Sequence, residues 1–423
     1  MKQKHHRMLC AFCALVILVS TVFPTAAFAE QPVDAAAAEQ TLTRADAAEM
    51  QQADAAVTAL TESEQYQEMD TDARKDAALA QLDTLAAKGL VEKDSIYTDE
   101  ENGMVSFRYP CGVLGGILLT EPEDETLDEE NAGTETTSNA LPLRLPPDLG
   151  AEMQKSRAAL LRRTENQAVE KFGTAVIYYA FDNTINSSRF PYYSYMQGFW
   201  SALGLETKIN IHVTVADLKK MGNYNVSVLS AHGSYYTYSY GKFLKRTRTE
   251  PIMLLTEEST FGKDLRYGFD LLAHRVIKVN GMYCVTSDFF RNAYKGGKLS
   301  NTIVYSETCE FLGVDGSEDN AMADALLSGG AQAVIGYVNN VYTVYSRSML
   351  WDTINHLIMG QNVGQALEHA KATYGEDDLI WYHAQGGRRP HAAASYAVLY
   401  GNSQAALHVP ESNRSMFSAD LAA

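Results

Sequence analysis

The chain has 423 residues, of which 46% are hydrophobic, with five cysteines and a formal net charge of −17. This composition excludes a disordered protein, and the length is sufficient for one large domain or two ordinary ones. The acidic balance argues against a general nucleic-acid binder, because phosphate contacts need clustered Lys and Arg side chains. The five irregularly spaced cysteines match neither a disulfide scaffold nor a zinc ribbon.

The negative charge is concentrated in one segment. Residues 1–29 carry a net charge of +3, residues 30–140 carry −20, and the remainder is balanced at zero. We therefore predict an acidic N-terminal region attached to an electrically neutral domain. The predicted divisions, in chain order, are a signal peptide at 1–29, an acidic N-terminal region and candidate pro-region at 30–120, an acidic linker at 121–145, a main domain at 146–410 and a tail at 411–423.

The N-terminus has the pattern of a secretory signal peptide. Residues 1–7 are basic, residues 8–23 are apolar, and Ala27-Phe28-Ala29 supplies small residues before a cleavage point at Glu30. This pattern predicts a secreted or extracytoplasmic mature protein that is not associated with a membrane. The alternative is an N-terminal membrane anchor, but the apolar run is shorter than the roughly 20 residues of a spanning helix.

Three cysteines remain in the mature chain, because Cys10 and Cys13 lie in the signal peptide. They are Cys111, Cys284 and Cys309. An odd number leaves at least one unpaired thiol in an exported protein. Whether Cys111 pairs with Cys284 stays open.

The acidic region is predicted to be a small helical unit followed by a hairpin. Apolar residues recur at roughly helical intervals within residues 30–90, which indicates about two amphipathic helices. Residues 104–107 and 113–119 are two short apolar runs separated by a Pro-Cys-Gly turn, which predicts a β-hairpin. Residues 121–139 contain eight acids and no bases, which is typical of a solvated linker.

From about residue 150, helical and strand patterns alternate. Strands are predicted at 174–181, 208–214, 226–230, 252–255, 275–285, 302–306, 333–337 and 395–400. Helices are predicted at 153–172, 188–203, 216–221, from 288, and at 321–327, 346–359 and 363–374. This succession predicts an α/β fold, a three-layer α/β/α sandwich with a mostly parallel sheet.

Two of the predicted strands end in residues that carry chemistry. Residues 226–230 lead into Ala231-His232-Gly233, and residues 302–306 lead into Glu307-Thr308-Cys309. Because ligands bind beyond the carboxyl ends of parallel strands, we expect the histidine and the cysteine to meet at one sheet edge. An imidazole can take the proton of a thiol and so activate it. The N–H groups of Gly233 and Cys309 would then form an oxyanion hole.

These residues resemble the caspase-like (clan CD) cysteine peptidases, which include gingipains, clostripain-like enzymes and the CHAT module. The matching motifs are VSVLSAHG at 226–233, TIVYSETC at 302–309 and GAQAVIG at 330–336, while the Asp-Pro that commonly follows the last strand is missing after Gly401. The resemblance covers residues 172–408. It implies peptide-bond hydrolysis through an acyl-enzyme on a Cys309/His232 dyad, with a protein or peptide as substrate and neither a metal nor an organic cofactor.

The resemblance also implies where the residue before the cleaved bond would bind. Asp182 follows the first strand, and Glu307 precedes the nucleophile by two residues. This carboxylate pair would favour Arg or Lys as the residue before the cleaved bond. The alternative is that both are solvated loop acids or helix caps. A basic specificity would make Arg162-Arg163, 245–248 and Arg388-Arg389 candidate sites of autocleavage, and the acidic region would be a pro-region, a spacer or a docking module.

Other readings of the chain remain open. A catalytically silent caspase-like fold would act as a secreted or surface interaction module. An α/β hydrolase is disfavoured, because the chain lacks a Gly-x-Ser-x-Gly elbow. His274, His356 and His369 lack close metal-ligand spacing and are predicted to be surface or cap residues. The acidic run at 315–320 lacks the full spacing of a calcium loop and is predicted to cap the helix that follows.

Overall fold

The computed structural model describes residues 41–119, 169–181, 192–241, 245–379 and 394–417. The predicted signal peptide, the acidic linker, nearly all of the helix predicted at 153–172 and two of the three candidate autocleavage sites lie outside these residues. None of the helices in the described part of the chain combines the length and the apolar character that crossing a membrane requires. Residues Thr41–Ala423 form one compact unit.

The protein is a mixed α/β molecule with a central six-stranded sheet. The strand order is β5-β4-β6-β11-β14-β15, and every neighbouring pair is parallel except β14 and β15. The bounds are β4 Gly173–Ala180, β5 Leu205–Asn210, β6 Val226–Ala231, β11 Ile303–Ser306, β14 Ala333–Val338 and β15 Tyr396–Gly401. Each overlaps a predicted strand, although β5 begins three residues and ends four residues before the predicted 208–214. The inner strands β6, β11 and β14 are buried throughout, which is typical of parallel strands covered on both faces.

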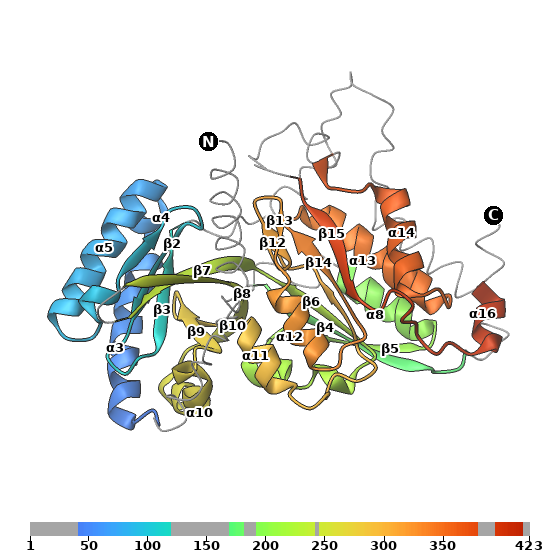
Figure 1. Ribbon diagram of the computed structural model, residues 1–423, viewed down its shortest axis with the longest axis horizontal. Coiled ribbons are helices and arrows are strands. Elements are labelled where there is room, and N and C mark those ends of the chain that lie inside the picture. The colour runs from blue at the N-terminus through green and yellow to red at the C-terminus, as the bar shows by residue number, and fades with distance from the viewer. Residues whose placement is uncertain (1–40, 120–168, 182–191, 242–244, 380–393, 418–423) are drawn as a thin grey trace, which may run out of the picture. The chain divides into compact units, whose positions relative to one another are not determined.

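Helices pack on both faces of this sheet (Figure 1). Successive strand residues alternate between two hydrophobic clusters, so that Val228 belongs to one cluster and Leu229 to the other. The first face is covered by α8 Tyr192–Ala202, α13 Thr343–Ile358 and α14 Val363–Tyr374. The second cluster contains residues of α9 Val215–Leu218, α11 Ser287–Ala293 and α12 Ala321–Ser328.

A second, seven-stranded sheet joins the N-terminal hairpin to the middle of the chain. Its order is β1-β2-β3-β9-β10-β8-β7, and all pairs are antiparallel except β3 with β9. The bounds are β1 Tyr97–Asp99, β2 Met104–Arg108, β3 Leu114–Leu118, β7 Gly233–Tyr240, β8 Arg246–Glu258, β9 Val276–Val279 and β10 Met282–Thr286. The predicted hairpin is confirmed as β2 and β3. The described residues on both sides of the charge boundary near residue 140 therefore belong to one compact unit.

The single strand predicted at 275–285 is wrong, because the chain reverses at its centre. β9 and β10 form a hairpin around Asn280 and Gly281, which have φ of 47° and 76°. Asn-Gly is the preferred pair for such a tight turn, because both positions need positive φ. β7 was not among the predicted strands.

The remaining elements surround the two sheets. On the second sheet lie α3 and α10, which pack against each other, together with α4 and α5. The bounds are α3 Arg44–Thr61, α4 Glu64–Gln67, α5 Thr71–Ala87, α10 Phe261–Leu272 and α16 Glu411–Phe417, with single turns η1 Lys93–Ser95 and η2 Met221–Asn223 and a short hairpin of β12 Gly313–Val314 and β13 Ser317–Glu318. The helices expected within 30–90 are thus confirmed.

A buried ionic network ties α3 and α10 to β9. Lys278, which is only 1% exposed, lies 2.5 Å from Asp54 and 2.9 Å from Asp264. Tyr109 donates to Asp54, and Tyr283 donates to Asp264 at 2.7 Å. Because each carboxylate accepts hydrogen bonds as well as facing the ammonium group, the buried charges are compensated.

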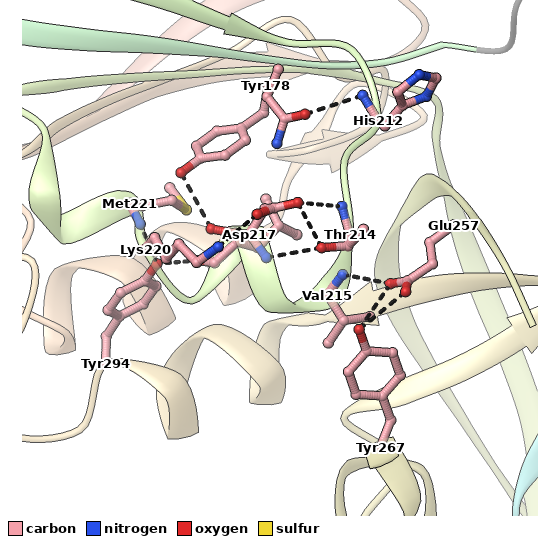
Figure 2. A network of polar contacts seen from close by, with 12 residues as sticks. Tyr178, His212, Thr214, Val215, Asp217, Lys220, Met221, Glu257, Tyr267 and Tyr294 are labelled. Atoms are coloured by element: carbon pink, nitrogen blue, oxygen red, sulfur yellow. Dashed lines mark hydrogen bonds and ion pairs between the residues drawn. The ribbon is translucent and has the colours of Figure 1, made fainter. Parts of the chain in front are cut away.

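A polar network anchors α9, the short helix in the connection between β5 and β6 (Figure 2). Thr214 caps the helix because its hydroxyl oxygen accepts from the Asp217 N–H at 3.1 Å, and the same hydroxyl donates to the Asp217 carboxylate at 2.6 Å. Glu257 of β8 accepts from the Val215 N–H at 2.9 Å and from the Tyr267 hydroxyl at 3.1 Å. The network therefore connects a crossover of the first sheet with β8 and α10 of the second.

Candidate functional site

His232 lies where the chain passes from the first sheet to the second. It is the one residue between β6 and β7, and its carbonyl accepts from the Leu254 N–H of β8 at 2.9 Å. Its half-buried ring packs edge-to-face on Phe181, with ring centroids 4.7 Å apart and an interplanar angle of 85°. The backbone and the ring of His232 are therefore both positioned by neighbouring strands.

Cys309 lies at the same level beyond the neighbouring strand. β6 and β11 are parallel with Ile303 opposite Val226, and the pairing continues past β11, where the Glu307 N–H donates to the Leu229 carbonyl at 2.8 Å. The half-buried thiol is 3.9 Å from the carbonyl oxygen of Val341, just before α13. Because the register is constant, the segment carrying the cysteine runs beside the segment carrying the histidine.

The two segments touch through Gly233. A Cβ at this position would lie 2.0 Å from the Cys309 carbonyl oxygen and 2.5 Å from the Cγ2 atom of Thr308. No side chain fits at such a distance, so the close approach of the two backbones requires glycine. The sequence-based expectation that the two motifs lie together at one sheet edge agrees with this contact.

The N–H of Gly233 is directed away from β8. Leu254 bonds to His232, so these two residues form a hydrogen-bonded pair of the antiparallel β7–β8 ladder. Bonded and non-bonded pairs alternate along such a ladder, and the next pair joins Gly233 and Met253. Since β7 is the end strand of its sheet, the Gly233 amide faces outward, as an oxyanion donor must.

Glu307 is buried and engaged by other side chains. It is 5% exposed, and its carboxylate accepts from the Tyr193 hydroxyl at 2.8 Å and from the Ser346 hydroxyl at 3.4 Å. Burial raises its pKa, while the positive charge of the buried Arg347 acts in the opposite direction. The predicted partner acid, Asp182, lies outside the described residues. Glu307 is therefore part of a buried polar cluster with residues of α8 and α13.

Three further acidic residues, Glu310, Asp315 and Asp319, follow Cys309 in the chain. Glu310 has a positive φ of 53°, and burial together with the charge of Asp315 raises its pKa to about 7. Asp319 accepts from the Tyr235 hydroxyl at 3.0 Å, and the charge of Glu310 also acts on Tyr235. These carboxyl groups all belong to the segment that follows the cysteine.

The other two cysteines are poorly suited to nucleophilic chemistry. All three cysteines of the described residues are thiols and not disulfides. Burial raises the pKa of Cys111 to about 11, and it raises the pKa of the fully buried Cys284 still further. A raised pKa leaves almost no thiolate near neutrality. Cys309 is therefore the cysteine on which the chemical argument rests.

Of His274, His356 and His369, which were predicted to be surface or cap residues, only His356 departs from the prediction. His274 follows α10 with φ of 56°, which is a cap position, and its Nε2 atom lies 3.1 Å from the Gly112 carbonyl oxygen. His369 is exposed on α14. His356 is 4% exposed and lies inside α13, so the surface or cap assignment is wrong for this residue. Burial lowers the pKa of both His274 and His356.

The acidic run at 315–320 forms the turn and second strand of the β12–β13 hairpin. Asp315 and Gly316 occupy the turn with φ of 53° and 72°. The N-cap residue of α12, Asn320, makes no side-chain capping hydrogen bond, but Asp319 before it accepts from the Ala321 N–H at 2.9 Å, so the capping prediction is met only by this neighbouring residue. Of the candidate autocleavage sites, Lys245 precedes β8, while Arg246 and Arg248 are paired within it.

Sequence reasoning missed two kinds of neighbour. Phe181 follows directly on β4, and its place next to a parallel strand was a usable signal, because such ends meet at one edge. Arg347 and Tyr193 come from helices far along the chain, and nothing in their local sequence indicates that they reach Glu307. No protein-family model matches the chain, and no curated protein matches it either.

Proposed function

We propose that this protein is an exported cysteine endopeptidase with a caspase-like α/β/α fold, in which Cys309 is the nucleophile and His232 is the general acid and base. The observation that carries the proposal is the contact of the His232-Gly233 and Cys309 segments beyond adjacent parallel strands. This geometry supports a thiol and an imidazole at one edge of the sheet, next to the Gly233 amide, which is directed away from β8. A silent interaction module would not need this convergence.

The residues at this edge supply each step of the reaction. His232 takes the proton of the Cys309 thiol, and the Sγ atom attacks the peptide carbonyl carbon. The developing oxyanion is held by the N–H groups of Gly233 and Cys309. His232 then gives its proton to the departing amine, which leaves an acyl-enzyme thioester. A water molecule, deprotonated by His232, attacks the thioester and releases the acid with the thiol restored.

A basic residue before the cleaved bond is part of the proposal. Support comes from the carboxyl groups of Glu310, Asp315 and Asp319 near Cys309, and less from Glu307, whose carboxylate is buried and accepts two hydrogen bonds. A cationic side chain near Glu310 would compensate charges that otherwise oppose thiolate formation at Cys309. We therefore expect Arg or Lys to be preferred over Asp or Ala at this position.

The test uses the purified mature protein with peptide substrates ending in Arg, Lys, Asp, Asn or Ala before a reporter amine. We expect Cys309→Ala to abolish turnover and His232→Ala to lower kcat/KM by about 10²–10⁴-fold. Cys111→Ala is the matched control and should retain activity, and thermal melts of all variants check folding. Equal turnover by the wild type and Cys309→Ala would exclude the peptidase, and a preference for Asp or Ala would exclude only the basic specificity.

A further inference from the structure

A histidine-carboxylate cluster lies between α13 and α14, in a part of the molecule that the proposed reaction does not use. Asp352 and His356 are one turn apart on α13, and His369 faces them from α14. One ligand atom from each of the three side chains can be chosen so that all three lie within 4.8 Å of one another. Three residues from two helices thus converge on one point.

The contacts within the cluster are directed toward a common centre. The two oxygens of Asp352 face different histidines, with Oδ2 2.7 Å from Nδ1 of His369 and Oδ1 3.8 Å from Nε2 of His356. The two imidazole rings are stacked, with centroids 3.7 Å apart and planes tilted by 36°. Each ring can remain neutral and offer a nitrogen lone pair, so the two imidazoles and the carboxylate bring three ligand atoms within reach of one cation.

We infer that Asp352, His356 and His369 form a binding site for a divalent transition-metal ion of the Zn²⁺ class. Imidazole nitrogen and carboxylate oxygen are ligands that Zn²⁺ prefers, and bonds of about 2.0–2.1 Å place tetrahedral ligand atoms roughly 3.3 Å apart. The present separations need a contraction of about 1.5 Å at most. Since the side chain of His369 is 45% exposed, it can rotate without disturbing the core.

A neighbouring glutamine fits this assignment. The backbone N–H of Gln361, in the connection between the helices, donates to the His356 carbonyl at 3.0 Å. The Oε1 atom of Gln361 and the Nδ1 atom of His356 are both buried, and the Gln361 side chain acts on the His356 ring as a hydrogen-bond partner. A metal bound at Nε2 fixes the ring proton on Nδ1, which then needs an acceptor of the kind that Gln361 offers.

The site would fix the two helices to each other. α13 begins just beyond Val341, whose carbonyl oxygen lies near the thiol of Cys309, and it carries Ser346 and Arg347 beside Glu307. A metal that binds only the folded chain stabilises it by RT ln(1 + L/Kd), where L is the free metal concentration, so the stabilisation grows with the logarithm of that concentration. The metal site is independent of the proposed peptidase activity and would exist in a catalytically silent protein.

The test titrates untagged mature protein with Zn²⁺, and with Co²⁺ as a spectroscopic probe. The protein carries Cys309→Ala so that this thiol cannot compete as a ligand. We expect one equivalent to bind, an unfolding temperature that rises with Zn²⁺ concentration, and visible Co²⁺ absorption typical of low coordination number. His369→Ala and Asp352→Asn should each weaken the affinity by about tenfold or more and remove the rise in unfolding temperature.

His408→Ala is the matched control, because His408 is exposed on another segment and should leave the affinity unchanged. The unfolding temperatures of the metal-free variants show whether each is folded. His369 is a surface residue, so His369→Ala is expected to fold normally. Absence of stoichiometric binding, or equal affinity in wild type and His369→Ala, would overturn the assignment. Loss of binding in His408→Ala alone would place the metal elsewhere.

Discussion

The two sheets differ in where they hold charge. In the six-stranded sheet the inner strands β6, β11 and β14 carry no charged residue, and two buried ionic groups lie outside the strands, Glu307 after β11 and Arg347 in α13. In the seven-stranded sheet Lys278 and Glu250 lie in the strands themselves. A sheet of consecutive parallel units can be specified by hydrophobic pattern alone. A sheet that pairs distant segments gains specificity from charges that fit only one partner, a role known for some buried polar groups.

The largest effect is expected when the buried ammonium group of the second sheet is removed, which tests whether buried charge stabilises this sheet. Lys278→Ala leaves Asp54 and Asp264 buried without their cation. We expect the free energy of unfolding to fall by about 3–5 kcal/mol, measured by urea denaturation. Lys219→Ala is the control, because its pair with Asp270 is 2.8 Å long but the lysine is 42% exposed. That change should cost about 1 kcal/mol or less, and equal losses would refute the role assigned to burial.

A second prediction concerns the pH dependence caused by Glu250 on β8. Burial raises its pKa from 4.5 to about 7, so the folded protein keeps the proton that the unfolded chain has lost. The contribution of Glu250 to stability is therefore greatest below pH 4.5, falls as the pH rises to about 7, and stays low above that value. Glu250→Gln should flatten this decline and stabilise the protein at pH 8 by up to about 3 kcal/mol.

The matched variant for Glu250 is Glu310→Gln, beside the candidate site. Burial also raises the pKa of Glu310 to about 7, but this residue is partly exposed. Solvent screening should make its effect on stability clearly smaller than that of Glu250. Denaturation curves at pH 4, 6 and 8 measure both. A larger effect from Glu310 would mean that burying a carboxylate costs more free energy beside the candidate site than in the second sheet.

These differences explain which features could be predicted from the sequence. β6 and β11 are short continuous apolar runs, and a parallel sheet brings their ends together, so the placing of His232 beside the Cys309 segment followed from local pattern. The pairing of β3 with β9 joins residues more than 150 positions apart and leaves no local signal. Glu307 was assigned to a binding pocket from its position before Cys309. Its burial could not be predicted, because it depends on Tyr193 and Arg347, whose positions are tertiary information.

Gly233 tests the contact at the first sheet's edge. Gly233→Ala places a Cβ against the Cys309 carbonyl, so the two segments must separate. We expect a loss of about 1–3 kcal/mol in the free energy of unfolding, and a fall in kcat/KM if the peptidase proposal holds. Gly198→Ala in α8 is the control, since nothing lies within 4 Å of its new methyl group. It should stabilise the helix by about 0.5–1 kcal/mol.

The smallest predicted effect separates turn geometry from long-range pairing in the second sheet. Asn280 has a positive φ of 47°, and its Oδ1 atom accepts from the Leu118 N–H of β3 at 3.0 Å. Asn280→Gly keeps the turn and loses this hydrogen bond, which should cost about 0.5–1.5 kcal/mol. Asn280→Ala loses the bond and also strains the turn, which adds roughly 1–2 kcal/mol. If hydrogen exchange of β3 amides is faster in Asn280→Gly while exchange in β6 is unchanged, the side chain holds the N-terminal hairpin to the sheet. Equal stability of the Gly variant and the wild type would assign its whole role to the turn.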